Sequence, residues 1–104
     1  MPLQFRMRSM KYFAVSYDYN PNNPEIDKAR PAHREFTAQL FEEGTIIATG
    51  PLTDSKGGAL IIVGLADDAV VADAIALMDN DPFYQASCIT GRSFREWSPV
   101  NARF

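Results

Sequence analysis

The chain has 104 residues, of which 46% are hydrophobic and 22% charged, with a net charge of -3 and a sequence pI near 5.0. This length fits one domain with a buried core, and the modest charged content excludes an intrinsically disordered chain. The acidic balance gives no broad attraction for nucleic acid or for an anionic membrane surface, so neither is an expected partner.

Residues 1–9 are expected to form an N-terminal arm, and residues 10–104 the domain. The arm lacks the apolar stretch of a secretory signal, no run in the chain is long enough to span a bilayer, and Met7 or Met10 is an alternative start. Cys88 is the only cysteine, which excludes an internal disulfide. We therefore expect a cytoplasmic protein with a reduced, half-buried thiol.

A strand is predicted over residues 10–19, where Phe13, Val15 and Tyr17 alternate with the side chains between them. Residues 20–24 contain two prolines and three asparagines, which cannot continue a strand ladder. This segment is therefore a loop that leads into the next element.

A helix is predicted over residues 31–43, because Ala32, Phe36 and Leu40 recur every four residues. Proline suits the first turn of a helix, and the glycine at position 44 suits its C-terminal cap. Alternatively, residues 24–30 form an earlier turn of the same helix, and Pro31 then marks a kink or a break.

Two further strands are predicted over residues 45–50 and 59–63, both rich in β-branched side chains. Residues 53–58 between them have the composition of a turn, so the two strands form a hairpin.

A second helix is predicted over residues 68–78 with Asp67 as its N-cap, because its apolar residues recur at helical spacing. Residues 82–87 are expected to add one helical turn, and residues 89–97 alternate as a fourth strand. The order βαββαβ predicts an α+β, ferredoxin-like fold, in which a four-stranded antiparallel sheet carries two helices on one face.

The other face of the predicted sheet has an unusual composition. Residues 60–63 are apolar without alternation, so two large side chains are expected to be exposed on that face. A second copy of the sheet would cover them, which predicts a homodimer through the sheet face, with a higher oligomer possible. The alternative is a monomer with one apolar patch.

Two residues are candidates for acid–base chemistry. His33, the only histidine, shares a helical face with Phe36 and Leu40, which turns it toward the sheet. Taken alone, such a histidine is more often structural than catalytic. Asp81 precedes Pro82, as an N-cap does, and a capping carboxylate keeps one oxygen free for an imidazole.

Beyond this pair, the sequence offers one candidate anion-binding residue and no good metal site. Arg30 lies three residues before His33 and would suit a carboxylate or phenolate, although an ion pair with Glu25 or Asp27 is at least as good an interpretation. One histidine with no second histidine or cysteine at ligand spacing makes a poor metal site, so no metal is expected.

Several short motifs together resemble the YCII-like (YciI-related) proteins. The resemblance covers about residues 10–99 and depends on the order and spacing of Arg30-Pro31-Ala32-His33, Glu43-Gly44 leading to Gly50-Pro51, Asp81-Pro82-Phe83 and the closing Trp97. It implies a dimeric α+β barrel, an architecture shared with muconolactone isomerases and small haem-free monooxygenases. It also implies a pocket in which His33 faces Asp81.

The resemblance gives one chemical precedent, a dehydrochlorinase of chlorinated hydroxyhydroquinones. It implies that Arg30, Pro51 and Phe83 contact a substrate. Family members often have glycine near Ser87, and the added hydroxyl and bulk of this serine are expected to alter what fits the pocket.

The leading hypothesis is an enzyme that uses His33 as general base or acid on a small anionic cyclic compound, with Asp81 holding the imidazole. The reaction would be a lyase, dehydrochlorinase or isomerase step, and no cofactor is expected. The alternative is a non-catalytic metabolite-binding or accessory domain in which His33 and Asp81 form a structural ion pair. A catalyst needs its imidazole at an open cavity, whereas a structural pair would be sealed by side chains.

Overall fold

The computed structural model describes residues 10–104, and the predicted arm of residues 1–9 lies outside the described residues. The elements follow in the order β1 (Met10–Asp18), α2 (Pro24–Glu42), β2 (Ile46–Pro51), β3 (Ala59–Ala66), α3 (Val71–Met78), α4 (Pro82–Gln85) and β4 (Gly91–Trp97). Within the described part of the chain, no helix is long and apolar enough to cross a membrane.

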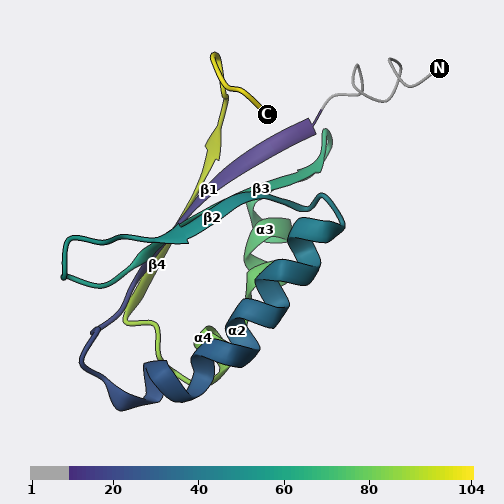
Figure 1. The fold of residues 1–104 in the computed structure, drawn as a ribbon. Coiled ribbons are helices and arrows are strands. Elements are labelled where there is room, and N and C mark those ends of the chain that lie inside the picture. Colours follow the sequence, from purple (N-terminus) through teal and green to yellow (C-terminus); the bar gives the residue numbers. More distant parts are fainter. Residues whose placement is uncertain (1–9) are drawn as a thin grey trace.

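The four strands form one antiparallel sheet in the order β2-β3-β1-β4. All the helices lie on one face of this sheet, and α2 runs along it over most of its length (Figure 1). This arrangement confirms the predicted α+β, ferredoxin-like fold. The sheet order places β1 at the centre, between β3 and β4, so side chains on its helix-facing side are fully enclosed.

The core lies between the sheet and the helices. The period of two that predicted β1 is visible in its burial, because Phe13, Val15 and Tyr17 are at most 1% exposed. Ile61 and Val63 of β3 and Met78 of α3 complete the same layer. Tyr17 therefore carries its hydroxyl group into the middle of the core, where that group needs a polar partner.

Helix α2 begins earlier than the first prediction and continues through Pro31 without a break. The Asn23 side chain caps it by accepting a hydrogen bond from the Glu25 amide at 3.0 Å. A proline inside a helix removes one backbone donor, and a helix of 19 residues packed against a sheet tolerates that loss. As a result, the segment before Pro31 shares one helix with His33.

The prediction that Asp67 caps the second helix is wrong, because α3 begins at Val71 and residues 66–69 form a turn closed by an Ala69–Ala66 backbone hydrogen bond of 2.9 Å. Asp73 binds the Val70 amide at 2.8 Å from inside the helix and stabilises its first turn. The other differences are shifts at element ends: β1 ends at Asp18, α2 ends at Glu42, β2 spans Ile46–Pro51, β3 runs on to Ala66, α4 ends at Gln85 and β4 begins at Gly91.

On the face of the sheet away from the helices, one of the two apolar side chains that were expected to be exposed is buried. Leu60 is 46% exposed, whereas Ile62 on the same face is 8% exposed, so only one of the two expected side chains is open. At one end of this face Phe104 lies near the rings of Tyr12 and Trp97, with ring centroids 6.1 and 6.3 Å away.

Candidate functional site

Two local features of the chain bring His33 and Asp81 toward each other. His33 projects from the middle of α2 on the side that faces α4. Asp81 is the N-cap of α4, and its Oδ1 accepts a hydrogen bond from the Phe83 amide at 2.9 Å, as expected for an aspartate before a proline. The cap fixes the carboxylate at the end of α4 that lies against α2.

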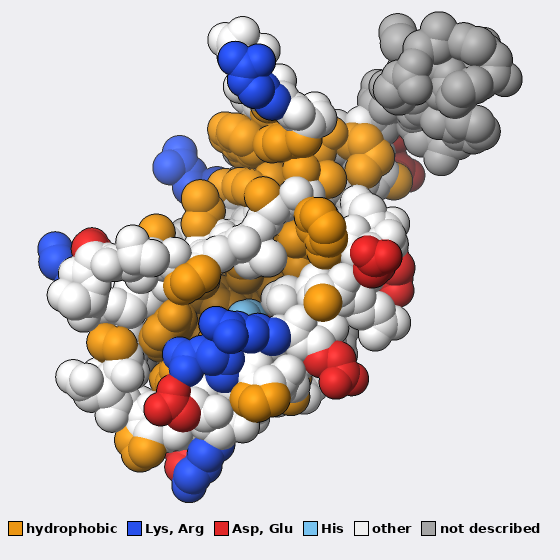
Figure 2. Space-filling view, in the orientation of Figure 1, with side chains coloured by type: hydrophobic (Ala, Val, Ile, Leu, Met, Phe, Trp, Pro, Cys, Tyr) orange, Lys and Arg blue, Asp and Glu red, His pale blue; other side chains and the backbone are white. Residues whose placement is uncertain are grey.

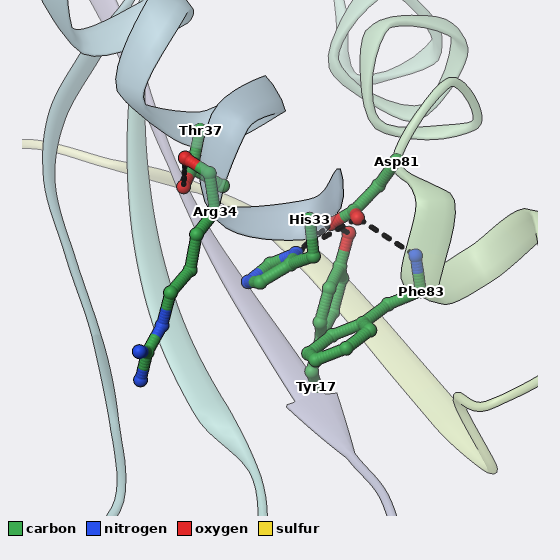
Figure 3. A network of polar contacts seen from close by, with 6 residues as sticks. All are labelled: Tyr17, His33, Arg34, Thr37, Asp81 and Phe83. Carbon is green, nitrogen blue, oxygen red and sulfur yellow. Dashed lines mark hydrogen bonds and ion pairs between the residues drawn. The ribbon is translucent and has the colours of Figure 1, made fainter. Parts of the chain in front are cut away.

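The His33 imidazole is hydrogen-bonded to this carboxylate. Its Nδ1 lies 2.8 Å from Asp81 Oδ1 and 3.0 Å from Oδ2 (Figure 3). The Asp81 side chain is fully buried, and that of His33 is 12% exposed. The two residues are 48 positions apart in the chain, so only the packing of α2 on α4 creates the pair.

The ring of His33 is held in orientation from a second direction. It stacks on the ring of Phe83, with centroids 3.9 Å apart and planes inclined by 5°. Because Asp81 accepts from its partners, we assign the proton to Nδ1, which leaves Nε2 with a free lone pair. In Figure 3 the Nε2 edge of the ring points away from Asp81. The arrangement can therefore take up a proton at Nε2 and return it.

Tyr17 supplies a third contact to the carboxylate. From a buried position near the end of β1, its hydroxyl group donates to Asp81 Oδ2 at 2.8 Å. Burial is the main cause that raises the pKa of Tyr17 far above its ordinary value of 10.0, and the negative charge of Asp81 and the hydrogen bond to it add to the shift. The phenol therefore keeps its proton and stays a donor. Tyr17 was not predicted for the site, because the alternation of β1 already explained it as a core residue.

Replacing Tyr17 by Phe is expected to flatten the alkaline limb of the stability profile. Above the ordinary pKa of 10.0 the unfolded chain releases a proton that the folded wild type keeps, so the free energy of unfolding falls as the pH rises. Phe has no such proton, so this part of the loss disappears. Denaturant unfolding between about pH 8 and pH 11 measures it. Tyr84→Phe is the matched control at an exposed tyrosine, and parallel profiles for Tyr17→Phe and the wild type would contradict the assignment.

The His33 side chain borders a cavity of about 220 Å³ between α2 and the β2–β3 hairpin. Figure 2 shows the pale-blue imidazole in a hollow, with Lys or Arg side chains beside it. The cavity is lined by Tyr19, Arg30, His33, Arg34, Thr37, Thr49, Gly50, Pro51, Ala59 and Phe83. This volume is smaller than that of pockets for drug-sized ligands, so it suits a molecule with a single ring.

One wall of the cavity is a polar stripe of α2 that the sequence analysis missed in part. Arg30, His33, Arg34 and Thr37 follow the spacing i, i+3, i+4, i+7, which places them on one helical face. The prediction oriented this helix by its four-residue apolar repeat, placed His33 and Arg30 relative to that repeat, and left out Arg34 and Thr37. The polar repeat was therefore a readable signal for Arg34 and Thr37.

The remaining predicted contact residues divide into two groups. Arg30, Pro51 and Phe83 border the cavity, and Arg30 is also ion-paired with Asp27 on its own helix, as the alternative interpretation expected. Ser87 does not border it. It is exposed just after α4 in the left-handed conformation, with φ of 59°. Glycine suits that backbone, so the departure from the family pattern at Ser87 concerns a turn, and we leave Ser87 out of the site.

Neither the cysteine nor a metal site adds to this cavity. Cys88 is buried in the core, more deeply than expected, and burial raises the pKa of its thiol. Over residues 10–104 no group of three or more histidine, cysteine, aspartate or glutamate side chains is placed to hold a metal ion.

The fold and the site define a ferredoxin-like α+β protein with an imidazole–carboxylate pair at a small cavity. A model of the YCII-related domain matches residues 10–98. The chain therefore belongs to the YCII-related family. No curated protein matches the sequence.

A solved structure with a similar fold is 5-chloro-2-hydroxyhydroquinone dehydrochlorinase from Burkholderia phenoliruptrix AC1100, in complex with 2,5-dihydroxybenzoquinone. The similarity covers 84% of this chain and 93% of that chain, with a TM-score of 0.68 and 19% sequence identity. At this identity the similarity establishes the shared fold.

Proposed function

We propose that this protein is a small-molecule enzyme in which His33 transfers protons on an anionic cyclic compound and Asp81 holds the imidazole in position. The reaction is a lyase step, such as loss of hydrogen chloride, or an isomerisation. The observation that carries this proposal is the position of His33. Its Nδ1 is fixed by a buried carboxylate while its ring borders an open cavity, whereas a purely structural pair would be sealed.

Such a reaction needs one side chain that accepts a proton from the substrate and then donates a proton back to it. In the loss of hydrogen chloride from a chlorinated hydroxyhydroquinone, two ring hydroxyls lose protons, one proton goes to the carbon that carries chlorine, and chloride leaves with the bonding pair. The ring is left as a hydroxybenzoquinone, so no external oxidant is needed. His33 Nε2 would take one hydroxyl proton and return it to carbon, and the second hydroxyl proton would pass to water as chloride leaves. An isomerase would use the same two His33 steps on a lactone.

Turnover of candidate compounds tests the proposal. The purified protein is incubated in heavy water with 5-chloro-2-hydroxyhydroquinone, hydroxylated benzoates and lactone acids. We expect chloride release, double-bond migration or exchange of ring C–H hydrogens with solvent, well above the rate without protein. These are measured by a chloride electrode and by proton NMR.

The matched control is His33→Gln, whose amide can still donate to Asp81 but has no basic nitrogen. The metabolite-binding alternative would be favoured if the protein binds these compounds and converts none of them faster than His33→Gln does.

We also propose that this enzyme is cytoplasmic, and its lone reduced thiol agrees with that location.

We also propose that two copies pair through the sheet face away from the helices, as in a dimeric α+β barrel. Leu60 is 46% and Trp97 37% exposed, and Tyr12 and Ile62 lie on the same face. Burying such a face against its own copy removes apolar area from water in both subunits.

Replacing Leu60 by Glu is therefore expected to shift the protein from dimer to monomer. The change places one carboxylate from each subunit in an apolar interface, where each would lose its hydration. Sedimentation equilibrium measures the mass. Phe41→Glu is the control, because Phe41 is 55% exposed on α2, away from this face. A wild type that is already monomeric at high concentration would refute the pairing.

A further inference from the structure

We infer that Arg34 binds the anionic group of the substrate at the mouth of the cavity, and that the substrate is a single hydroxylated ring with its charge at one end. Because it concerns the same cavity, this inference rests on the proposed function. It assigns the anion to Arg34 rather than to Arg30, and it gives the ligand a direction.

Charge is distributed unevenly around the cavity. Among its lining residues are two arginines and the histidine, and no aspartate or glutamate. Asp81 lies behind the imidazole, fully buried and already bonded to His33, Tyr17 and the Phe83 amide. Asp81 is therefore not free to neutralise a cation in the cavity, and the cavity favours an anionic ligand.

The two arginines differ in what already neutralises them. Arg30 is ion-paired with Asp27 one turn earlier. Over residues 10–104 the Arg34 side chain has no ion-pair partner. The two guanidinium groups lie on one helical face at a spacing of four residues, where like charges repel each other. An anion at Arg34 would relieve this repulsion and would have little competition from the protein's own carboxylates.

Exposure gives the ligand its direction. Arg34, Thr49 and Pro51 are exposed and form the mouth, whereas Thr37, Ala59 and Phe83 are 6%, 6% and 2% exposed and form the floor. A ligand with one charged end would keep that end at the hydrated mouth and bury its ring.

Thr37 gives the floor a polar group for such a ring. The Thr37 hydroxyl donates to the Arg34 carbonyl at 3.2 Å, and its oxygen lone pairs stay free to accept from a ligand hydroxyl. His33 lies between the two ends of the cavity wall, at the helical positions between Arg30 and Thr37. A hydroxylated ring held by Arg34 would therefore lie beside the imidazole.

A pair of probes that differ only in charge tests the role of Arg34. The dissociation constants of 4-hydroxybenzoate and 4-hydroxybenzamide are measured by titration calorimetry for the wild type and for Arg34→Gln, Arg34→Lys and Arg30→Gln. We expect the wild type to prefer the carboxylate by about tenfold or more. Arg34→Gln should weaken carboxylate binding about 10- to 100-fold and leave amide binding unchanged, as expected for loss of a charged hydrogen bond.

Two further variants make the result specific. Arg34→Lys should restore part of the preference, because it keeps the charge and loses the planar fork. Lys28→Gln removes the same charge from the same helix at a residue outside the cavity, and should change neither constant. An unchanged preference in Arg34→Gln, a larger loss in Arg30→Gln, or no binding of either probe to the wild type at millimolar concentration would each overturn the inference.

Failure of this inference and failure of the proposed function give different results. An anion preference that depends on Arg34, in a protein that changes none of the candidate compounds, would support the anion site and contradict the enzyme. Turnover that depends on His33, with no effect of Arg34→Gln on binding, would support the enzyme and contradict the anion site.

Discussion

Replacing His33 by Gln is expected to lower turnover of any substrate of this protein by about 100- to 10,000-fold, the usual contribution of one general acid–base group. The Gln amide can donate to Asp81 in place of Nδ1, so the buried carboxylate keeps a partner. What disappears is the Nε2 lone pair of a side chain that borders the cavity. The turnover number is measured on a compound identified in the heavy-water experiment, and circular dichroism checks that the fold is retained.

The binding constant separates this interpretation from a loss of substrate affinity. If His33 transfers a proton, the dissociation constant of 4-hydroxybenzoate should change by about threefold or less, because its anionic end binds elsewhere in the cavity. A variant with wild-type turnover would eliminate His33 as the catalytic residue. A variant whose whole defect lies in binding would make it a ligand contact only.

The second large effect is expected at Asp81, where two substitutions should act differently. Asp81→Ala removes the acceptor of the Tyr17 hydroxyl and the Phe83 amide, both of which are buried. Each donor left without a partner costs about 1 to 3 kcal/mol, so the unfolding free energy should fall by roughly 3 kcal/mol or more. In a chain of this length that loss lowers the Tm by about 10 °C or more.

Asp81→Asn should keep most of the stability and lose the activity. Its amide oxygen can still cap α4, and its NH₂ group can donate to the Tyr17 oxygen after the hydroxyl turns, so we expect a cost of about 1 kcal/mol. The same NH₂ group competes with the proton on His33 Nδ1 and favours the tautomer whose Nε2 carries hydrogen. Turnover should then fall by about 100-fold or more.

Thermal unfolding and turnover measured on both Asp81 variants decide the matter. Equal stability of Asp81→Ala and Asp81→Asn would show that the buried donors find other partners. Full activity in Asp81→Asn would show that the carboxylate does not set the tautomer of His33.

The sequence determined the elements of this fold because their signals are local. The alternation in β1 and the four-residue repeat in α2 can be read from residues close together in the chain. The same is true of the capping of α4 by Asp81. The error at Asp67 has the same origin: a good capping residue predicted the helix start, whereas the chain first makes a turn and Asp73 stabilises the helix from within.

Only the tertiary structure decided which side chains meet at the cavity. Tyr17 and Asp81 are 64 residues apart, and their contact depends on how β1, in the centre of the sheet, is covered by α2 and α4. Ser87 is only six positions from Asp81 in the chain and still lies outside the cavity, because a left-handed residue turns the backbone away after α4. Periodicity shows which face of an element is buried, but strand register and helix packing decide what that face touches, and those depend on the whole chain at once.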